Sequence, residues 1–160
     1  MKSWKVLIAA ALLAVPMNAA HAGSQDLLST ANQAGKFYEL LEAADIAGLT
    51  DTLKGPGPYT VFAPTDEAFE KLEPDFIEYL LQPENKGELA AMLKKHIVLG
   101  KLLVADLKGT SEPLSTLLDS QLQVDSTDGL RIANARVTAS DMLASNGVIH
   151  AIDTVIEPRL

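Results

Sequence analysis

The stretch that decides the fold is Tyr59-Thr-Val-Phe-Ala-Pro-Thr-Asp-Glu-Ala-Phe-Glu-Lys-Leu72. Its first four residues are aromatic or β-branched, a composition that predicts a β-strand. The strand should end at Pro64, because proline has no N–H to donate to a neighbouring strand. Thr65 then predicts a helix N-cap, since its side-chain oxygen can accept a hydrogen bond from the first helical turn. The stretch therefore predicts a buried strand that turns sharply into a capped helix.

Three segments of the chain resemble a known family. Residues 60–69, Thr-Val-Phe-Ala-Pro-Thr-Asp-Glu-Ala-Phe, resemble the first signature segment of fasciclin domains. Residues 146–158, Asn-Gly-Val-Ile-His-Ala-Ile-Asp-Thr-Val-Ile-Glu-Pro, resemble the second signature segment. Lys95-His96 stands between them, where the family usually has a Tyr-His segment. The three segments occur in the family's order, so the chain resembles a fasciclin domain protein of the bacterial secreted type.

The hydrophobic pattern changes along the chain and predicts an α+β domain. Apolar residues recur at helical spacing in residues 37–44 and 75–81, whereas residues 121–126 alternate as in a strand. Asp128-Gly129 predicts a hairpin turn, and residues 148–156 form the most strand-like run. Helices first and strands later favour α+β. The resemblance implies more: a fasciclin-like, wedge-shaped β-sandwich of two sheets with several short helices on one side.

The N-terminal segment predicts export. Lys2 and Lys5 precede an apolar run at residues 6–15, and Ala20-His21-Ala22 offers a signal peptidase site. We therefore predict a cleaved signal peptide at residues 1–22 and a single fasciclin-like domain at 23–160, in the periplasm or outside the cell. An uncleaved N-terminal anchor is the alternative. No apolar run is long enough to span a bilayer, so we predict that the protein is not integral to the membrane.

Charge and cysteine content exclude several classes of partner and site. Of 13 basic residues, 11 remain after Lys2 and Lys5 are removed; against 21 acidic residues this gives a mature net charge of −10. Nucleic acid is disfavoured because binding it requires clustered Lys and Arg, and anionic lipid is disfavoured for the same reason. The chain has no cysteine, which excludes disulfides, thiol nucleophiles and cysteine-ligated metals.

The residues do not predict an enzyme. Beyond residue 22 the only histidines are His96 and His150, and neither belongs to a nucleophile motif or has zinc-ligand spacing. His150 alternates with apolar neighbours, which favours a buried structural histidine satisfied by hydrogen bonds. Asp125 and Asp128 lack the pattern of a calcium loop and are interpreted as turn residues. We predict no catalytic site, metal or cofactor.

The resemblance implies a binding module that contacts proteins or extracellular matrix. In adhesive members an Asp-Ile pair just ahead of the second signature segment is associated with receptor binding, together with the Tyr-His segment. Asp141-Met142 stands at the position of that pair, and Lys95-His96 at the position of the other. The candidate partner-binding residues are therefore Asp141, Met142, Lys95 and His96. For Asp141-Met142 the alternative is a structural corner, with Met142 buried and Asp141 bonded to nearby backbone N–H groups.

A carrier of an apolar small molecule is the alternative function. Some fasciclin proteins bind carotenoids, and the apolar residues Leu89, Met92 and Leu93 have the spacing of a helix face that could line a groove. Residues at such spacing are also typical of an ordinary core. The sequence leaves the identity of the partner and the oligomeric state open.

Overall fold

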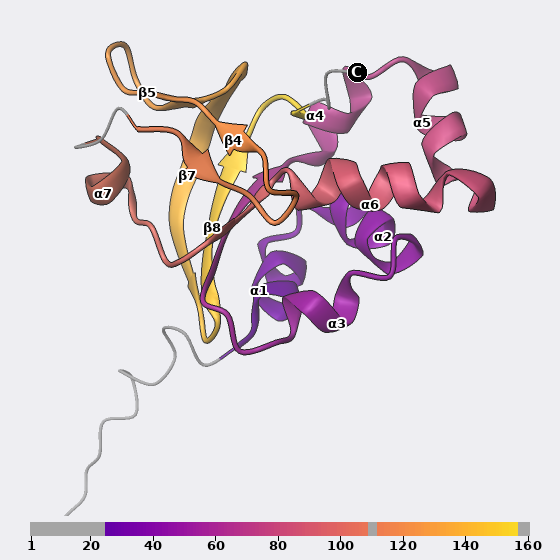
Figure 1. The fold of residues 1–160 in the computed structure, drawn as a ribbon, viewed down its shortest axis with the longest axis horizontal. Helices are drawn as coiled ribbons and strands as arrows, with labels where there is room; N and C mark the ends of the chain where they lie inside the picture. The colour runs from indigo at the N-terminus through magenta and orange to yellow at the C-terminus, as the bar shows by residue number, and fades with distance from the viewer. Residues whose placement is uncertain (1–24, 109–111, 157–160) are drawn as a thin grey trace, which may run out of the picture.

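The structure is a computed structural model that describes residues 25–108 and 112–156 (Figure 1). The predicted signal peptide, residues 1–22, lies outside the described residues. The helices are α1 (Leu27–Ala34), α2 (Tyr38–Ile46), α3 (Thr50–Leu53), α4 (Asp66–Glu70), α5 (Pro74–Leu81), the 3-10 helix η3 (Pro83–Asn85), α6 (Lys86–Lys94) and α7 (Val104–Lys108). The strands are β1 (Tyr59–Pro64), β2 (Ile97–Leu99), β3 (Leu114–Ser115), β4 (Gln121–Leu122), β5 (Val124–Asp125), β6 (Arg131–Ile132), β7 (Ala135–Ala144) and β8 (Gly147–Ile152). Within the described ranges, no helix has the length and apolar character needed to cross a membrane.

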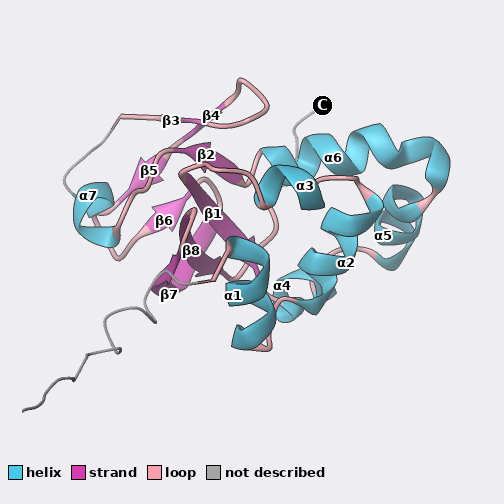
Figure 2. Cartoon of the chain, turned by 90° about the horizontal axis from the view of Figure 1, so that it is seen from below, coloured by secondary structure: helices cyan, strands magenta, loops and turns pink. Residues whose placement is uncertain are grey.

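Six strands form one mixed sheet in the order β2-β1-β8-β7-β6-β5, and β3 pairs with β4 separately. β1 and β8 are parallel, whereas β2 runs antiparallel to β1 and β7 runs antiparallel to β8. The long strand β7 pairs with β6 at its start and with β8 over the rest of its length. It therefore connects strands β2, β1 and β8 on one side of the sheet to β6 and β5 on the other. Strands lie to one side and most helices to the other (Figure 2). The α+β prediction is confirmed.

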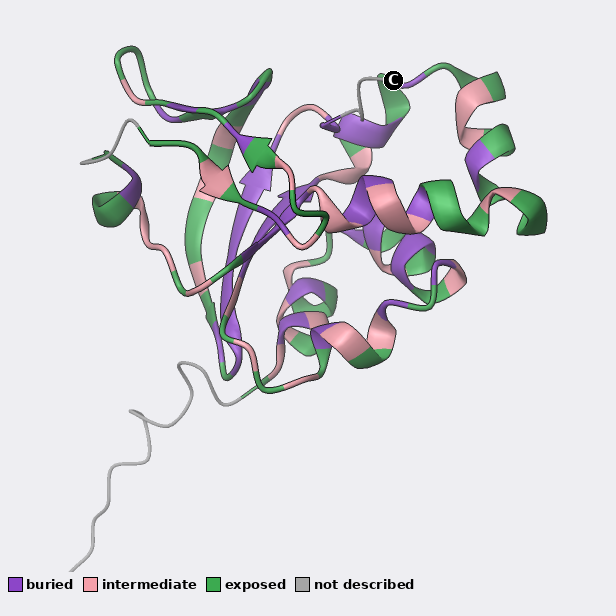
Figure 3. Cartoon of the chain, in the orientation of Figure 1, coloured by how far each residue is buried: buried purple, intermediate pink, exposed green. Residues whose placement is uncertain are grey.

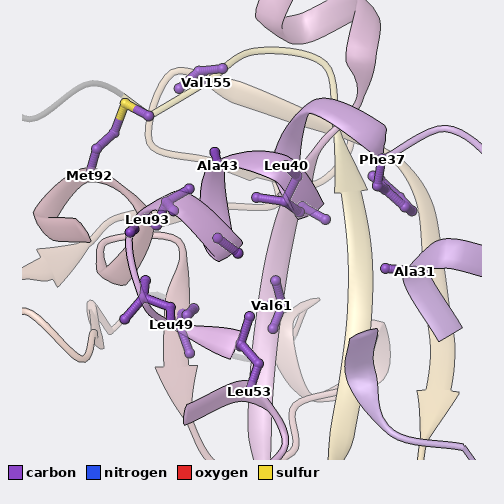
Figure 4. Close-up of a cluster of buried hydrophobic side chains, with 14 of the residues drawn as sticks. Ala31, Phe37, Leu40, Ala43, Leu49, Leu53, Val61, Met92, Leu93 and Val155 are labelled. Atoms are coloured by element: carbon purple, nitrogen blue, oxygen red, sulfur yellow. The ribbon is translucent and has the colours of Figure 1, made fainter. Parts of the chain in front are cut away.

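The sheet has a core on each face because successive side chains of a strand point to opposite faces. On β1, Val61 and Ala63 belong to a cluster with residues of α1 to α6, part of which Figure 4 shows. Phe62 belongs to a second cluster, with Leu107 of α7 and Ile132 of β6. The helices therefore cover one face of the sheet, and α7 with the short strands covers the other.

The junction predicted at Pro64-Thr65 is confirmed. β1 extends through Pro64, which lies opposite Ile152 of β8. The Thr65 side chain accepts a hydrogen bond from the Ala68 N–H at 3.3 Å and caps α4. Asp66 has a further role, because its Oδ1 accepts from the Glu39 N–H at 2.9 Å in the first turn of α2. One sharp turn thus fixes the starts of two helices.

The C-terminal third differs from the sequence expectation in two ways. The alternating run 121–126 forms two short strands, β4 and β5, with different partners. The run 148–156 is a strand only as far as Ile152, because its parallel partner β1 ends at Pro64 and Asp153 turns to exchange hydrogen bonds with the backbone of Arg136. The predicted hairpin at Asp128-Gly129 is confirmed: β5 and β6 are antiparallel on either side of it.

Candidate functional site

Asp141 lies at an irregularity in β7. The pairing of β7 with β8 shifts register between Ala139 and Met142, as at a β-bulge. Asp141 there has a φ of 57°, in the left-handed region that most side chains avoid. Aspartate tolerates this conformation better than most residues because its short side chain can hydrogen-bond locally. The structural corner, the alternative interpretation of Asp141-Met142, therefore takes the form of a kink within a strand.

Hydrogen bonds on both sides of Asp141 fix the kink. Its N–H donates to His150 Nδ1 at 3.1 Å, and its Oδ1 accepts from the N–H of Val104, the first residue of α7, at 3.0 Å. His150 Nε2 lies 2.7 Å from the Leu102 carbonyl oxygen. Since Nδ1 accepts, the network assigns the proton to Nε2, which donates to Leu102. This satisfied, buried His150 confirms the prediction of a structural histidine and ties β7, β8 and α7 together.

The electrostatics of the kink keep His150 neutral and leave the Asp141 carboxylate partly in solvent. Burial lowers the pKa of His150 below its usual value of 6.5, although the hydrogen bond to Leu102 and the nearby Asp141 charge oppose that shift. Asp141 Oδ1 lies 3.9 Å from Nδ1, and the Asp141 side chain is 46% exposed. A charged acceptor is thus held in a fixed position at the surface.

The residues after Asp141 alternate between the core and the surface. Met142 is half-buried, lies opposite Ile149 of β8 and packs against the helix-side core. Leu143 is 38% exposed. The kink therefore presents the Asp141 carboxylate and the Leu143 side chain to solvent, whereas Met142 contributes mainly to packing. Sequence reasoning missed Leu143, although the alternation of a strand next to a half-buried Met142 indicates it.

Lys95 and His96 lie at the end of α6, away from the kink. His96 is 1% exposed; its Nδ1 lies 2.8 Å from the Met92 carbonyl oxygen and its Nε2 accepts from the Ile156 N–H at 2.9 Å. Burial, helped by the Lys95 charge, lowers the His96 pKa to about 4. Because the His96 ring is buried, a partner cannot contact it directly. His96 can contribute to binding only by holding Met92 and Ile156 in position. Whether the four predicted residues contact a partner stays a prediction.

Lys95 lines an open hollow of about 600 Å³ on the sheet side. Gln121, Gln123 and Asn134 contribute amide side chains to the same hollow. The structure thus places Lys95 among polar groups on β4 and the turn between β6 and β7. It does not place Lys95 beside Asp141, which hydrogen-bonds to α7 and β8 residues.

Asn146 is a buried residue whose importance the sequence did not reveal. Its Oδ1 accepts from the Leu27 N–H at 3.0 Å, and its Nδ2 donates to the carbonyl oxygens of Leu53 at 2.6 Å and Gly55 at 2.8 Å. One side chain therefore joins the start of α1, the end of α3 and the turn between β7 and β8. The partners lie 91 to 119 residues away, so local patterns indicate only a turn at Asn146-Gly147.

Two small cavities lie within the apolar core of the described residues. An apolar cavity between α1, α2 and the sheet has a volume of about 30 Å³, and a second, beside Leu89 and Met92, has about 20 Å³. Pockets that hold small molecules typically measure roughly 300–1,000 Å³. The apolar residues that favoured a carrier, Leu89, Met92 and Leu93, are buried in the core. An apolar ligand would therefore have to bind at the surface or displace core side chains.

Comparison with known proteins identifies the family. The family model of the fasciclin domain matches residues 32–158. The uncharacterized protein sll1735 of Synechocystis sp. is 45% identical over 76% of this chain and 89% of its own length. The transforming growth factor-beta-induced protein ig-h3 of Sus scrofa is 41% identical over 77% of this chain and 18% of its own length. The chain belongs to the fasciclin domain family, as its signature segments predicted.

A solved structure supports the fold. The FAS1 domain pair of the insect cell adhesion molecule Fasciclin I superposes with a TM-score of 0.76, covering 85% of this chain and 52% of that one. At 20% sequence identity this likeness concerns the fold alone. The element order and the mixed sheet described above are therefore those of a FAS1 domain.

Proposed function

We propose that this protein is an exported, non-catalytic interaction module that binds a protein or extracellular-matrix partner through the corner of Asp141, Met142 and Leu143. One observation carries the proposal: the kink in β7 turns a carboxylate that is 46% exposed and a leucine that is 38% exposed outward within three residues. An exposed acid steers a charged partner, and an adjacent apolar side chain supplies area to bury.

The rigidity of the corner supports a binding role. The hydrogen bonds that Asp141 accepts from Val104 and donates to His150 hold the backbone in its left-handed conformation before any partner arrives. A preorganised surface loses less conformational entropy on binding than a flexible one. Side chains on a fixed scaffold are therefore suited to recognition.

The non-catalytic part of the proposal is supported by the two described histidines. Each ring has both nitrogens within hydrogen-bonding distance of backbone groups, His96 with Met92 and Ile156, and His150 with Leu102 and Asp141. A general base needs a nitrogen within reach of the proton that it removes. Neither ring has one to offer without breaking a buried hydrogen bond.

The export part of the proposal rests on the N-terminal charge, the apolar run and Ala20-His21-Ala22. Intact-mass measurement on protein from the native host is expected to show Gly23 as the first residue. Protein that retains Met1 and partitions with membranes would contradict cleavage and favour an N-terminal anchor.

The binding corner is tested with the double variant Asp141→Asn, Leu143→Ser. Asparagine keeps an acceptor for the Val104 N–H and tolerates positive φ, so this variant removes charge and apolar area without removing the helix α7 contact. The matched control is Asp128→Asn, Leu118→Ser, which changes an exposed acid and a leucine that is 37% exposed elsewhere on the sheet side.

Affinity is measured for a partner recovered by crosslinking in the native host, and the thermal midpoint is measured on the same samples. The corner variant is expected to bind at least about tenfold more weakly than the control, a loss of about 1.4 kcal/mol, with its midpoint unchanged within about 2 °C. Equal affinity of the two variants would contradict the proposed site.

The alternative, a carrier of an apolar small molecule such as a carotenoid, makes a different prediction. Protein purified from the native host would then show an absorbance band in the visible region. A featureless spectrum favours the interaction module, in line with interior cavities of about 30 and 20 Å³.

A further inference from the structure

Helix α5 covers only part of its apolar surface: Phe76 and Ile77 are half-buried where they pack against the helix-side core. Its sequence includes Phe76, Ile77, Tyr79, Leu80 and Leu81, yet of these only Leu80 is buried. Tyr79 is 41% exposed and Leu81 is 37% exposed. A helix that is apolar on most sides is normally enclosed by its neighbours, but α5 lies at the edge of the molecule with much of its surface in solvent (Figure 3).

An open hollow lies along this helix. It has a volume of about 620 Å³ and is lined by the apolar side chains of Leu72, Ile77 and Leu81 and by the carboxyl-bearing residues Glu70 and Glu78. We call this hollow and the exposed residues around it, residues 70–83, the α5 surface. Its combination of apolar lining and exposed acid distinguishes it from the enclosed core cavities.

The charge around the α5 surface is strongly negative. Residues 70–88 contain six exposed acidic side chains: Glu70, Glu73, Asp75, Glu78, Glu84 and Glu88. The two basic residues of this range are turned elsewhere. Lys71 Nζ donates to the Asp153 carbonyl oxygen at 2.7 Å, and Lys86 Nζ lies 3.5 Å from where a Cβ on Gly48 would be. These two lysines therefore leave the negative potential of the six acidic side chains largely uncompensated.

We propose that the α5 surface docks a basic amphipathic polypeptide, with Lys or Arg side chains beside Glu70 and Glu78 and apolar side chains in the hollow. Charge complementarity selects this occupant, because a second copy of this acidic chain would bring like charges together. Nucleic acid and anionic membranes are repelled for the same reason. The α5 surface and β7 lie at opposite sides of the molecule in Figure 1, so this proposal does not depend on the Asp141 corner.

The first test uses a defined probe and the whole protein. A fluorescent synthetic helix of Leu and Lys, about five turns long, is titrated with the protein and followed by anisotropy; a Leu and Glu peptide of the same pattern is the control. The Lys peptide is expected to bind and the Glu peptide is not. Binding should weaken between low salt and about 0.15 M, because exposed charges are screened. A Lys peptide that does not bind would overturn the proposal.

The second test locates the binding. The variant Glu70→Gln, Glu78→Gln, Leu81→Ser changes exposed residues of the α5 surface, so its thermal midpoint should not move. The matched control, Asp119→Asn, Asp128→Asn, Leu99→Ser, removes the same charge and one leucine on the sheet side, where Leu99 is 61% exposed. We expect at least about tenfold weaker binding of the Lys peptide by the first variant and a small change in the control.

Three results would overturn the proposal. Equal weakening in both variants would mean that net charge alone attracts the peptide. Amide chemical shifts that respond to the peptide on the sheet rather than at residues 70–83 would place it elsewhere. Concentration-dependent dimerisation that the α5 variant abolishes would make a second copy the occupant.

Discussion

Asn146 shows how a single buried amide can organise distant segments. The side chain uses its oxygen and both of its N–H donors on backbone groups of Leu27, Leu53 and Gly55. The neighbouring residue must be glycine, since a Cβ at Gly147 would clash with the Tyr59 carbonyl group. Together these residues bring the turn between β7 and β8 against β1 and fix the entry to α1.

The first prediction concerns this amide. Asn146→Ala leaves a buried N–H and two carbonyl groups without their partner, so we expect a loss of roughly 2–5 kcal/mol in the free energy of unfolding. Urea titration measures the loss. Asn134→Ala, at an exposed turn residue, is the control and should change stability by less than about 0.5 kcal/mol. Similar small losses in both variants would mean that water replaces the Asn146 contacts.

The second prediction concerns pH. The folded state lowers the His96 pKa to about 4, whereas the unfolded chain has the ordinary value of 6.5. Between these values the unfolded state binds the proton, so stability is retained above pH 6.5 and falls as pH drops toward 4. The full loss is about 3 kcal/mol, and the lowered pKa of His150 adds to it in the same direction.

Two measurements check the pH prediction. NMR titration should show the His96 ring neutral until the pH approaches 4, and urea midpoints should fall across the same window. A His96 ring that titrates near 6.5 would contradict the burial of the imidazole and its two hydrogen bonds to Met92 and Ile156. Such a result would also return His96 to the residues that a partner can contact.

At the scale of elements, the junction of β1 and α4 connects the two cores. Phe62 is fully buried on the face covered by the short strands and stacks on His150, with ring centroids 5.7 Å apart. Phe69 of α4 is buried in the core on the helix side. The short segment from Phe62 to Phe69, which includes the Thr65 cap, therefore connects the two cores.

The third prediction separates packing from capping at this junction. Phe62→Ala should cost roughly 3–5 kcal/mol, because it opens a cavity in a closed core. Thr65→Ala should cost only about 1 kcal/mol, because it removes one cap. Domain stabilities of roughly 5–15 kcal/mol make the first change capable of unfolding the protein and the second not. Equal losses in urea would mean that the cap also holds the position of β1.

Local signals predicted the elements well. Pro64-Thr65 marks the junction and Asp128-Gly129 marks the hairpin. Each of these signals determines the backbone conformation of only a few neighbouring residues. The apolar spacing of residues 102–107 fits a strand and a helix equally well. The structure has α7 at Val104–Lys108, and Asp141 of β7 accepts from its first N–H.

Long-range contacts account for what the sequence could not predict. The end of β8 at Ile152 follows from the end of its partner β1, and the capping of α2 by Asp66 joins two helices. At the candidate site, the alternative of a structural corner expected Asp141 to accept from backbone N–H groups, and Asp141 Oδ1 accepts from the Val104 N–H. That the donor lies 37 residues away, and that the Asp141 N–H donates to His150, was not predicted. Such contacts depend on tertiary structure, which no local pattern encodes.

At the scale of the whole molecule, charge is divided between the two layers. Twelve of the 21 acidic residues and four of the 13 basic residues lie between residues 38 and 94, the span of α2 to α6. The sheet side is nearly balanced by comparison. A partner at the Asp141 corner therefore meets a local carboxylate, whereas a partner at the α5 surface meets an extended negative field.

The most direct test of the proposed function places a photo-crosslinking amino acid at position 143 of the protein in its native host. Position 118 is the matched control, because Leu118 is 37% exposed and Leu143 is 38% exposed. The interaction module predicts a covalent adduct with a protein or matrix component from position 143, none from position 118, and a purified protein without a visible absorbance band. An identical pattern of adducts from both positions would contradict the proposed site, and a coloured protein that forms no adduct at position 143 would contradict the proposed function.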